Sequence, residues 1–134
     1  FTGVSVGNPH CVVFKPAGQS WSREDLLNLG PALENHAIFP KRTNVQLAVP
    51  TGPKELFILI WERGAGETQA SGSSSCAAAS AAIRLGLVKS PVTVKMPGGQ
   101  LNIEVAADYS LTMKGPVAEV ARGSLSPSFV RSLR

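Results

Sequence analysis

The sequence predicts an α+β fold in which a mostly antiparallel, barrel-like sheet wraps around one central buried helix. The segment from Gly72 to Leu85 is rich in alanine, a strong helix former, and is small and apolar on nearly every side. A helix without a polar stripe is buried all round rather than lying on a surface. Residues 55–62 form a near-continuous apolar run, which suits a strand buried on both faces. Short alternating runs joined by Gly and Pro turns are typical of antiparallel sheet.

The other strands are expected where β-type runs are bounded by turn residues. Gly7-Asn8-Pro9-His10 interrupts the first two runs, and Pro97-Gly98-Gly99 separates two later ones. Gly86 follows the buried helix and is expected to cap its C-terminus. The expected strands cover residues 1–6, 12–14, 45–49, 55–62, 92–96, 101–105, 109–113 and 117–121.

A further helix is expected before the strand at 45–49. Ser22 with Asp25 three residues later resembles a capping box, the signature of a helix start. Gly30-Pro31 is expected to stop or bend this helix, because proline lacks a backbone N–H and clashes with the preceding turn. The residues at helical apolar spacing are Leu26, Leu29 and Leu33.

Composition is that of one ordinary globular domain. The chain has 134 residues, of which 43% are apolar and 16% charged. The net charge of +4 comes from scattered Lys and Arg, without the clustered basic face that nucleic-acid binding needs. The longest uncharged apolar stretch, residues 70–83, is too short and too rich in Ser and Ala to span a bilayer. We therefore expect neither nucleic acid nor membrane as a partner.

The number of cysteines indicates the cellular compartment, and the first residue indicates whether the chain is a piece of a longer protein. Cys11 and Cys76 are too few for a secreted disulfide scaffold, and no signal-peptide pattern opens the chain, so a reducing cytoplasm is expected. No metal site is expected, because these cysteines, His10 and His36 lack the paired spacing of zinc ligands. The chain begins at Phe1, inside an expected strand, which suggests a piece of a longer protein.

A candidate anion site follows the long apolar strand. That strand ends in Glu62-Arg63, and after a Gly-rich turn the buried helix opens with Gly72-Ser73. Free N–H groups at a helix N-terminus point toward a ligand, and the helix macrodipole favours negative charge. Small residues let a carboxylate or phosphate approach, and Arg63 offers a second clamp. A P-loop is excluded because no lysine follows the glycines, and a nucleophile elbow because Cys76 stands where the motif needs glycine.

Every candidate residue also has a purely structural interpretation, which the sequence leaves open. Polar residues at helix starts and strand ends are commonly caps, turn residues or solvated positions, and cysteines among apolar neighbours are commonly inert. These interpretations are N-caps at Ser71 and Ser73, a solvated strand end at Glu62 and Arg63, a structural histidine at His10, a turn residue at Asn8, and core thiols at Cys11 and Cys76.

Four segments of the chain occur in a specific order. They are GNPHCVVF at 7–14, LGPALENHAIFPKRTNVQ at 29–46, WERGAGETQASGSSSCAAA at 61–79 and PGGQLNIE at 97–104. Together they resemble the C-terminal domain of the diaminopimelate epimerase family. The resemblance implies a two-domain enzyme with pseudo-symmetric halves, each wrapping a sheet around a central helix. Residues 1–123 are then one C-terminal epimerase-like domain and residues 124–134 a polar tail, and the N-terminal half is absent from this chain.

The activity implied by the resemblance is the interconversion of LL- and meso-diaminopimelate, in lysine and cell-wall precursor biosynthesis, without a pyridoxal cofactor. Two cysteines, one from each half, lie on opposite faces of the α-carbon; one thiolate takes the proton and the other thiol returns one. The catalytic-cysteine position is Ser71 in this chain. His10 and Glu62 match groups near the catalytic thiol. The positions that match substrate-contacting residues are Asn8, Asn44, Glu62, Arg63, Gly72 and Ser73.

Serine at position 71 departs from the family pattern. A serine hydroxyl is not appreciably ionised near neutral pH, whereas a thiol of pKa about 8.5 can be activated at a helix N-terminus. Cys76 matches a second, noncatalytic cysteine and points to a different face of the helix. The chain alone is therefore expected to be inactive. Two alternatives stay open: a stand-alone carboxylate- or amino-acid-binding module or relic, and dehydration, as in related proline-racemase-like enzymes with a changed catalytic residue.

Overall fold

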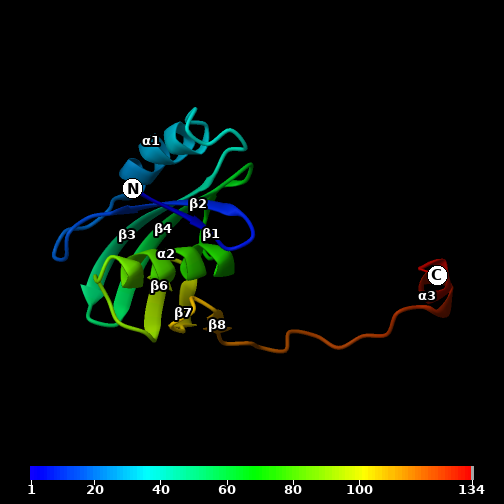
Figure 1. The fold of residues 1–134 in the computed structure, drawn as a ribbon. Helices are drawn as coiled ribbons and strands as arrows, with labels where there is room; N and C mark the ends of the chain where they lie inside the picture. Colours follow the sequence, from blue (N-terminus) through cyan, green and yellow to red (C-terminus); the bar gives the residue numbers. More distant parts are fainter. Residues whose placement is uncertain (134) are drawn as a thin grey trace.

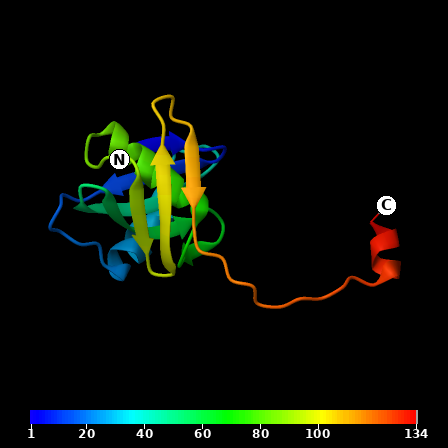
Figure 2. The ribbon, with the colours of Figure 1, turned by 90° about the horizontal axis from the view of Figure 1, so that it is seen from below.

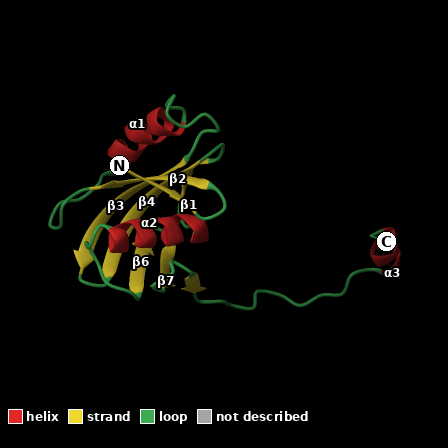
Figure 3. Ribbon diagram, in the orientation of Figure 1, coloured by secondary structure: helices red, strands yellow, loops and turns green. Residues whose placement is uncertain are grey.

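The computed structural model describes residues 1–133, which form a curled sheet around one helix and carry a second helix outside it (Figures 1 and 3). The expected fold class is confirmed. In chain order the elements are β1 (Thr2–Ser5), β2 (Pro9–Phe14), α1 (Arg23–Glu34), β3 (Asn44–Gly52), β4 (Glu55–Glu62), β5 (Gly66–Thr68), α2 (Gly72–Arg84), β6 (Val92–Met96), β7 (Gly99–Val105), β8 (Leu111–Lys114) and α3 (Pro127–Ser132).

The strands form one sheet in the order β1-β2-β3-β4-β6-β7-β8, with β5 paired to β4. Most neighbours are antiparallel, as expected, but β2–β3 and β4–β6 are parallel. The sheet curls around α2, which contacts strands β1–β4 and β6–β8. Figure 2 shows β6, β7 and β8 side by side beneath α2.

The central helix is the predicted one, shorter by one residue at its C-terminus. α2 begins after the N-cap Ser71 and contacts β1, β2, β3, β4, β6, β7 and β8. Gly86, at φ +71°, lets the chain leave the helix in the left-handed conformation that glycine tolerates. Its N–H donates to the Ile83 carbonyl at 3.0 Å, and the Leu87 N–H donates to the Ala82 carbonyl at 2.9 Å. The predicted C-terminal cap is therefore confirmed.

β4 is buried on both faces, as its apolar run predicts. Ile58 and Ile60 pack in the core that surrounds α2. Phe57, Leu59 and Trp61 face the opposite side and pack in a smaller core beneath α1. The two helices thus lie on opposite faces of the same strand, with α2 inside the curl and α1 outside it.

The outer helix begins as predicted but does not stop where expected. Ser22 Oγ accepts from the Asp25 N–H at 3.0 Å and the Asp25 carboxylate accepts from the Ser22 N–H at 3.0 Å, which completes the capping box. α1 then continues through Gly30 and Pro31 to Glu34. Gly30 is fully covered by the Trp61 ring, so packing against the sheet outweighs the one helical hydrogen bond that Pro31 lacks.

The last expected strand, at 117–121, does not form. Val117 and Val120 are 98% and 96% exposed, and no described strand lies beside them. Alternating polarity alone does not make a strand without a neighbour to share its hydrogen bonds. The segment instead runs away from the sheet and ends in α3 (Figure 1). Residue 134 of the expected tail lies outside the described residues. None of the helices within 1–133 is long and apolar enough to cross a membrane.

Replacing Gly30 by alanine tests the contact between α1 and the sheet. A Cβ at Gly30 would lie 2.6 Å from ring atoms of Trp61, so the helix or the ring must move. We expect Gly30→Ala to lower the free energy of unfolding by about 1–2 kcal/mol, although alanine alone favours a helix by about 1 kcal/mol. Urea unfolding measures the effect. Gly3→Ala, where a Cβ meets nothing within 4 Å, is the control and should change little. Equal stability of both variants would contradict tight packing here.

Candidate functional site

The site is assembled where the first residues of β2 and β3 meet the turn that follows β4. Because β2 and β3 are parallel, His10 and Asn44 are register partners. The Asn44 amide donates to the Pro9 carbonyl at 2.9 Å and accepts from the Arg63 backbone N–H at 2.9 Å. Asn44 is 7% exposed, and both ends of its amide are occupied by backbone. It therefore joins the Pro9 segment to the Arg63 turn.

His10 is buried, with 1% of its surface exposed, and its Nε2 lies 3.0 Å from Asn8 Oδ1. Burial lowers the pKa of His10, while the side chain of Gln46 and the charge of Glu62 raise it and Arg63 lowers it. Desolvation is the largest of these effects, so His10 is neutral near pH 7. Asn8 supplies a side-chain partner for His10, where the structural interpretation expected a backbone carbonyl.

The N-terminus of α2 carries the predicted serines. Ser71 is the N-cap, and its Oγ lies 3.5 Å from both the Ser74 N–H and Ser73 Oγ. These contacts are long, so Ser71 caps the helix only weakly. The N–H groups of Gly72 and Ser73 belong to the first turn, which has no intrahelical acceptors. Met113 from β8 lies against Gly72, where a Cβ would meet its sulfur at 3.0 Å.

Gln46 links the helix start to the histidine. Its Nε2 donates to Ser74 Oγ at 3.0 Å. The Gln46 side chain lies on the same face of the sheet as His10, and it raises the pKa of that histidine. The first turn of α2 is therefore bonded to Gln46, which lies next to the Asn8–His10 segment on the neighbouring strand. Neither Gln46 nor Ser74 is among the sequence-predicted site residues. The available signal was a glutamine inside an otherwise apolar strand, residues 45–49.

Glu62 and Arg63 occupy the end of β4 and the turn after it. Glu62 is half-buried and pairs in register with Gly66 of β5, and its charge raises the pKa of His10. Arg63 is exposed, and its Nη1 donates to the Lys41 carbonyl at 3.0 Å. The Arg63 backbone therefore lies beside Asn44, while its exposed side chain agrees with the interpretation of a solvated strand end.

Glu34, at the end of α1, organises this turn and was missed by sequence reasoning. Its carboxylate accepts from Trp61 Nε1 at 2.7 Å, from Arg42 Nη1 at 2.9 Å and from the Gly64 N–H at 2.9 Å. The Trp61 bond, the Gly64 bond and Arg42 hold the pKa of Glu34 below its ordinary value, against the opposing effect of burial. An acid in the last helical turn opposes the macrodipole, and this was the signal in the sequence.

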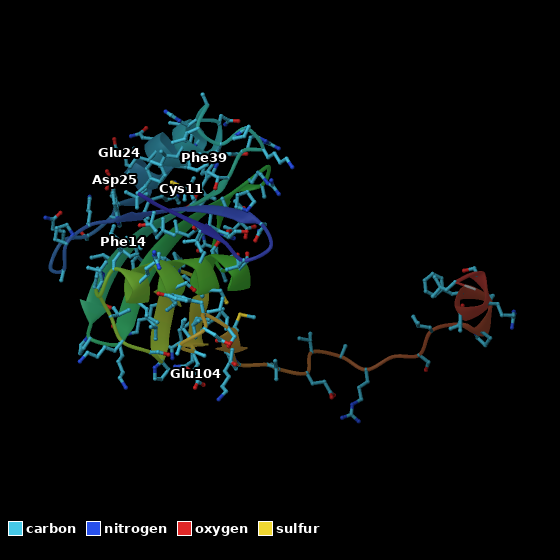
Figure 4. All side chains as sticks on the ribbon, in the orientation of Figure 1. Cys11, Phe14, Glu24, Asp25, Phe39 and Glu104 are labelled. Carbon is cyan, nitrogen blue, oxygen red and sulfur yellow. The ribbon has the colours of Figure 1, made fainter. Side chains whose placement is uncertain are left out.

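The two cysteines lie apart from this group. Cys11 is fully buried on the α1 side of the sheet, as Figure 4 shows, packed with Leu26 and Val45. Cys76 is half-buried and packs against the core around α2. Burial raises the pKa of both thiols, so both are protonated and unreactive at neutral pH. The interpretation of both as core cysteines agrees with this environment.

Comparison with known sequences gives one consistent family. The family described as diaminopimelate epimerase matches residues 2–120. The chain is 45% identical to the diaminopimelate epimerase of Desulfitobacterium hafniense over 93% of this chain and 43% of that protein. It is 45% identical to diaminopimelate epimerase 2 of a Nostoc species, over 94% of this chain and 43% of that protein. It is 46% identical to the diaminopimelate epimerase of Sphingopyxis alaskensis, over 90% of this chain and 44% of that protein. The chain thus spans less than half the length of these relatives.

Solved structures with a similar fold are more distant in sequence. A phenazine biosynthesis protein of the PhzF family from Bacillus anthracis aligns with a TM-score of 0.57 at 14% identity, over 80% of this chain and 34% of that one. A PhzF-family protein from Enterococcus faecalis aligns with a TM-score of 0.52 at 17% identity, over 75% of this chain and 35% of that one. At such identities the likeness concerns the fold alone.

Proposed function

Because the chain belongs to the diaminopimelate epimerase family, we propose that it is the C-terminal half of an enzyme that interconverts LL- and meso-diaminopimelate. Two hydrogen bonds support the proposal: Ser74, in the first turn of α2, bonds to Gln46, and the Arg63 N–H bonds to Asn44, the register partner of His10. A helix N-terminus, a neutral histidine and the Glu62–Arg63 turn would together suit a zwitterionic amino acid. The chemistry is a two-base proton transfer at the α-carbon in lysine and cell-wall precursor biosynthesis, and it uses no pyridoxal cofactor.

The substrate-binding residues in this proposal divide by charge. The N–H groups of Gly72 and Ser73 receive the α-carboxylate, because a helix N-terminus attracts anions. Glu62 and Arg63 supply one negative and one positive group for the ammonium and carboxylate ends. Asn8 hydrogen-bonds the substrate directly. Asn44 has both amide ends bonded to backbone, so we propose that it contributes mainly by holding the Arg63 turn in place.

Ser71 stands at the position of the proton-transferring thiol, with His10 and Glu62 as neighbouring catalytic groups. Its hydroxyl sits at the N-cap of α2, where a thiol would have a lowered pKa. A hydroxyl in the same place donates a hydrogen bond but does not remove a proton from carbon near neutral pH. The isolated chain is therefore proposed to be inactive in epimerisation.

The proposed partner is an N-terminal epimerase half, which supplies the opposite face of the α-carbon. The relatives are more than twice as long as the matched region, which leaves room for such a half. The tail gives further support. Val117 and Val120 are exposed, yet the family match continues to residue 120, as expected for a segment that packs against another part of the enzyme. We propose residues 1–123 as the domain, 124–134 as its tail, and a cytoplasmic location.

A second candidate function is a stand-alone module that binds a carboxylate or an amino acid and has lost turnover. Ser71 favours it, because the anion-binding features at the start of α2 are retained while the thiol is missing. The two candidates differ in what binding requires. An epimerase half needs its partner to enclose diaminopimelate, whereas a module binds its ligand alone.

Binding of meso-diaminopimelate tests the proposal. The chain is fused to the N-terminal half of the D. hafniense relative, and titration is followed by calorimetry and by the amide resonances of Gly72 and Ser73. We expect saturable binding to the fusion, loss of at least about tenfold in affinity in Arg63→Ala because a charged hydrogen-bonding partner is removed, and no saturation of the lone chain. Exposed Arg84→Ala, at the far end of α2, is the control and should bind normally. Saturable binding by the lone chain favours the module instead.

A further inference from the structure

A buried polar row, made of His10, Gln46 and Ser74, lies between the sheet and the first turn of α2. These side chains are 1%, 0% and 0% exposed. Val12 is the register partner of Gln46, and His10 lies two residues before Val12 on the same face of β2. Val12 packs in the core around α2, so His10 and Gln46 also point toward that helix. Ser74 meets them from the helix side.

Two atoms of the buried polar row have no hydrogen-bond partner within residues 1–133. They are His10 Nδ1 and Gln46 Oε1. The two side chains lie on the same face of neighbouring strands, and Gln46 raises the pKa of His10, as an acceptor facing the ring does. Leaving a buried donor or acceptor without a partner is unfavourable, and a hydrogen bond between these two atoms would satisfy both.

Ser74 faces the Nε2 end of the Gln46 amide, which leaves the Oε1 end for the histidine. Gln46 Nε2 donates to Ser74 Oγ at 3.0 Å, so Oε1 is the end available to His10. An amide oxygen only accepts, and its ring partner must therefore carry the proton. We infer that Gln46 and Ser74 are positioning residues that hold neutral His10 in the tautomer with its proton on Nδ1 and its lone pair on Nε2.

The consequence is that the proton-accepting nitrogen of His10 faces the candidate site. Nε2 lies 3.0 Å from the side-chain amide of Asn8, which is half-buried, while Nδ1 faces the fully buried Gln46. In the structure, Asn8 Oδ1 faces Nε2 and would accept a proton from it, so the proposed tautomer requires one of the two amides to turn. Asn8 is the one that turns its NH₂ toward Nε2, because it is half-buried, whereas the Gln46 amide is fully buried and bonded to Ser74. The charge of Glu62 raises the pKa of His10, and the charge of Arg63 lowers it.

The tautomer is read directly by two-bond ¹H–¹⁵N correlation NMR of the ¹⁵N-labelled chain at neutral pH. This measurement concerns the chain itself and is independent of substrate or turnover. His36 is the only other histidine and is exposed, so it serves as an internal reference, with His36→Asn to assign the signals. We expect a pyrrole-type shift for His10 Nδ1 and a pyridine-type shift for Nε2. The opposite assignment overturns the inference.

Matched serine variants test the role of Ser74. Ser74→Ala frees the Gln46 amide to turn, and we expect the ratio of the two His10 tautomers to change by about fivefold, the effect of one hydrogen bond. Ser75→Ala is the control, because that buried serine bonds to the Ser71 carbonyl and to Met96 instead, and the ratio should stay as in the parent chain. Gln46→Glu, which only accepts, should retain the proton on Nδ1. An unchanged ratio in folded Ser74→Ala, or equal changes in both serine variants, contradicts the inference.

Discussion

Fusing an N-terminal epimerase half to the Ser71→Cys chain should produce exchange of the α-proton of diaminopimelate for deuterium, at least about 10²-fold faster than the same fusion with Ser71. The added thiol lies at the N-cap of α2, where the helix terminus favours the thiolate, and the added half supplies the acid or base on the opposite face of the α-carbon. Proton NMR of the substrate in deuterium oxide measures the exchange.

The same experiment separates the two missing elements. Neither the lone chain nor its Ser71→Cys variant should exchange the α-proton, because one face of the carbon has no acid or base in either. In the active fusion, Cys76→Ser should leave exchange largely intact, since Cys76 packs against the core and burial raises its pKa. Clear exchange by the lone Ser71 chain would disprove the two-thiol interpretation, and loss of exchange in Cys76→Ser would assign the reactive thiol elsewhere.

Glu34→Ala should lower the free energy of unfolding by about 2–4 kcal/mol, because it removes the acceptor of Trp61 Nε1 and of the Gly64 N–H and leaves those donors unpaired. The loss should exceed that of any exposed carboxylate on α1. Glu24→Ala is the matched control: Glu24 lies exposed in the first turn of the same helix (Figure 4), and its removal should change stability by about 1 kcal/mol or less. Urea unfolding of the variants measures both values, and similar losses would contradict the role given to Glu34.

The dependence of stability on pH gives a second test of Glu34. Its pKa is lower in the folded chain than its ordinary value, so the ionised form stabilises the fold. That contribution is fully present above the ordinary range of a glutamate, near pH 4.3, and is lost as the pH falls through the lower folded value. The stability difference between the parent chain and Glu34→Gln should therefore shrink on acidification from about pH 6 to about pH 3. A difference that stays constant would show that the charge of Glu34 is not involved.

Local sequence patterns were sufficient for the elements that depend on neighbours in the chain. The small apolar segment from Gly72 and its glycine stop predicted α2, and the capping box predicted the start of α1. Residues 55–62 predicted a strand covered on both sides, which the two cores on either face of β4 confirm. The motifs at 7–14 and 61–79 pointed to the family, which the matches to known epimerases confirm. Helical period, caps and turns are short-range properties, so these features can be read from the chain directly.

Contacts between distant segments decided the remaining features. α1 continues through Pro31 because Gly30 packs on Trp61, which lies in another element. Residues 117–121 alternate in polarity like a strand but have no described neighbour to pair with. Glu34 bonds to Gly64, and Gln46 bonds to Ser74, only after the sheet has brought them together. Burial, pairing and hydrogen-bond geometry arise when segments far apart in sequence meet, so no local pattern encodes them.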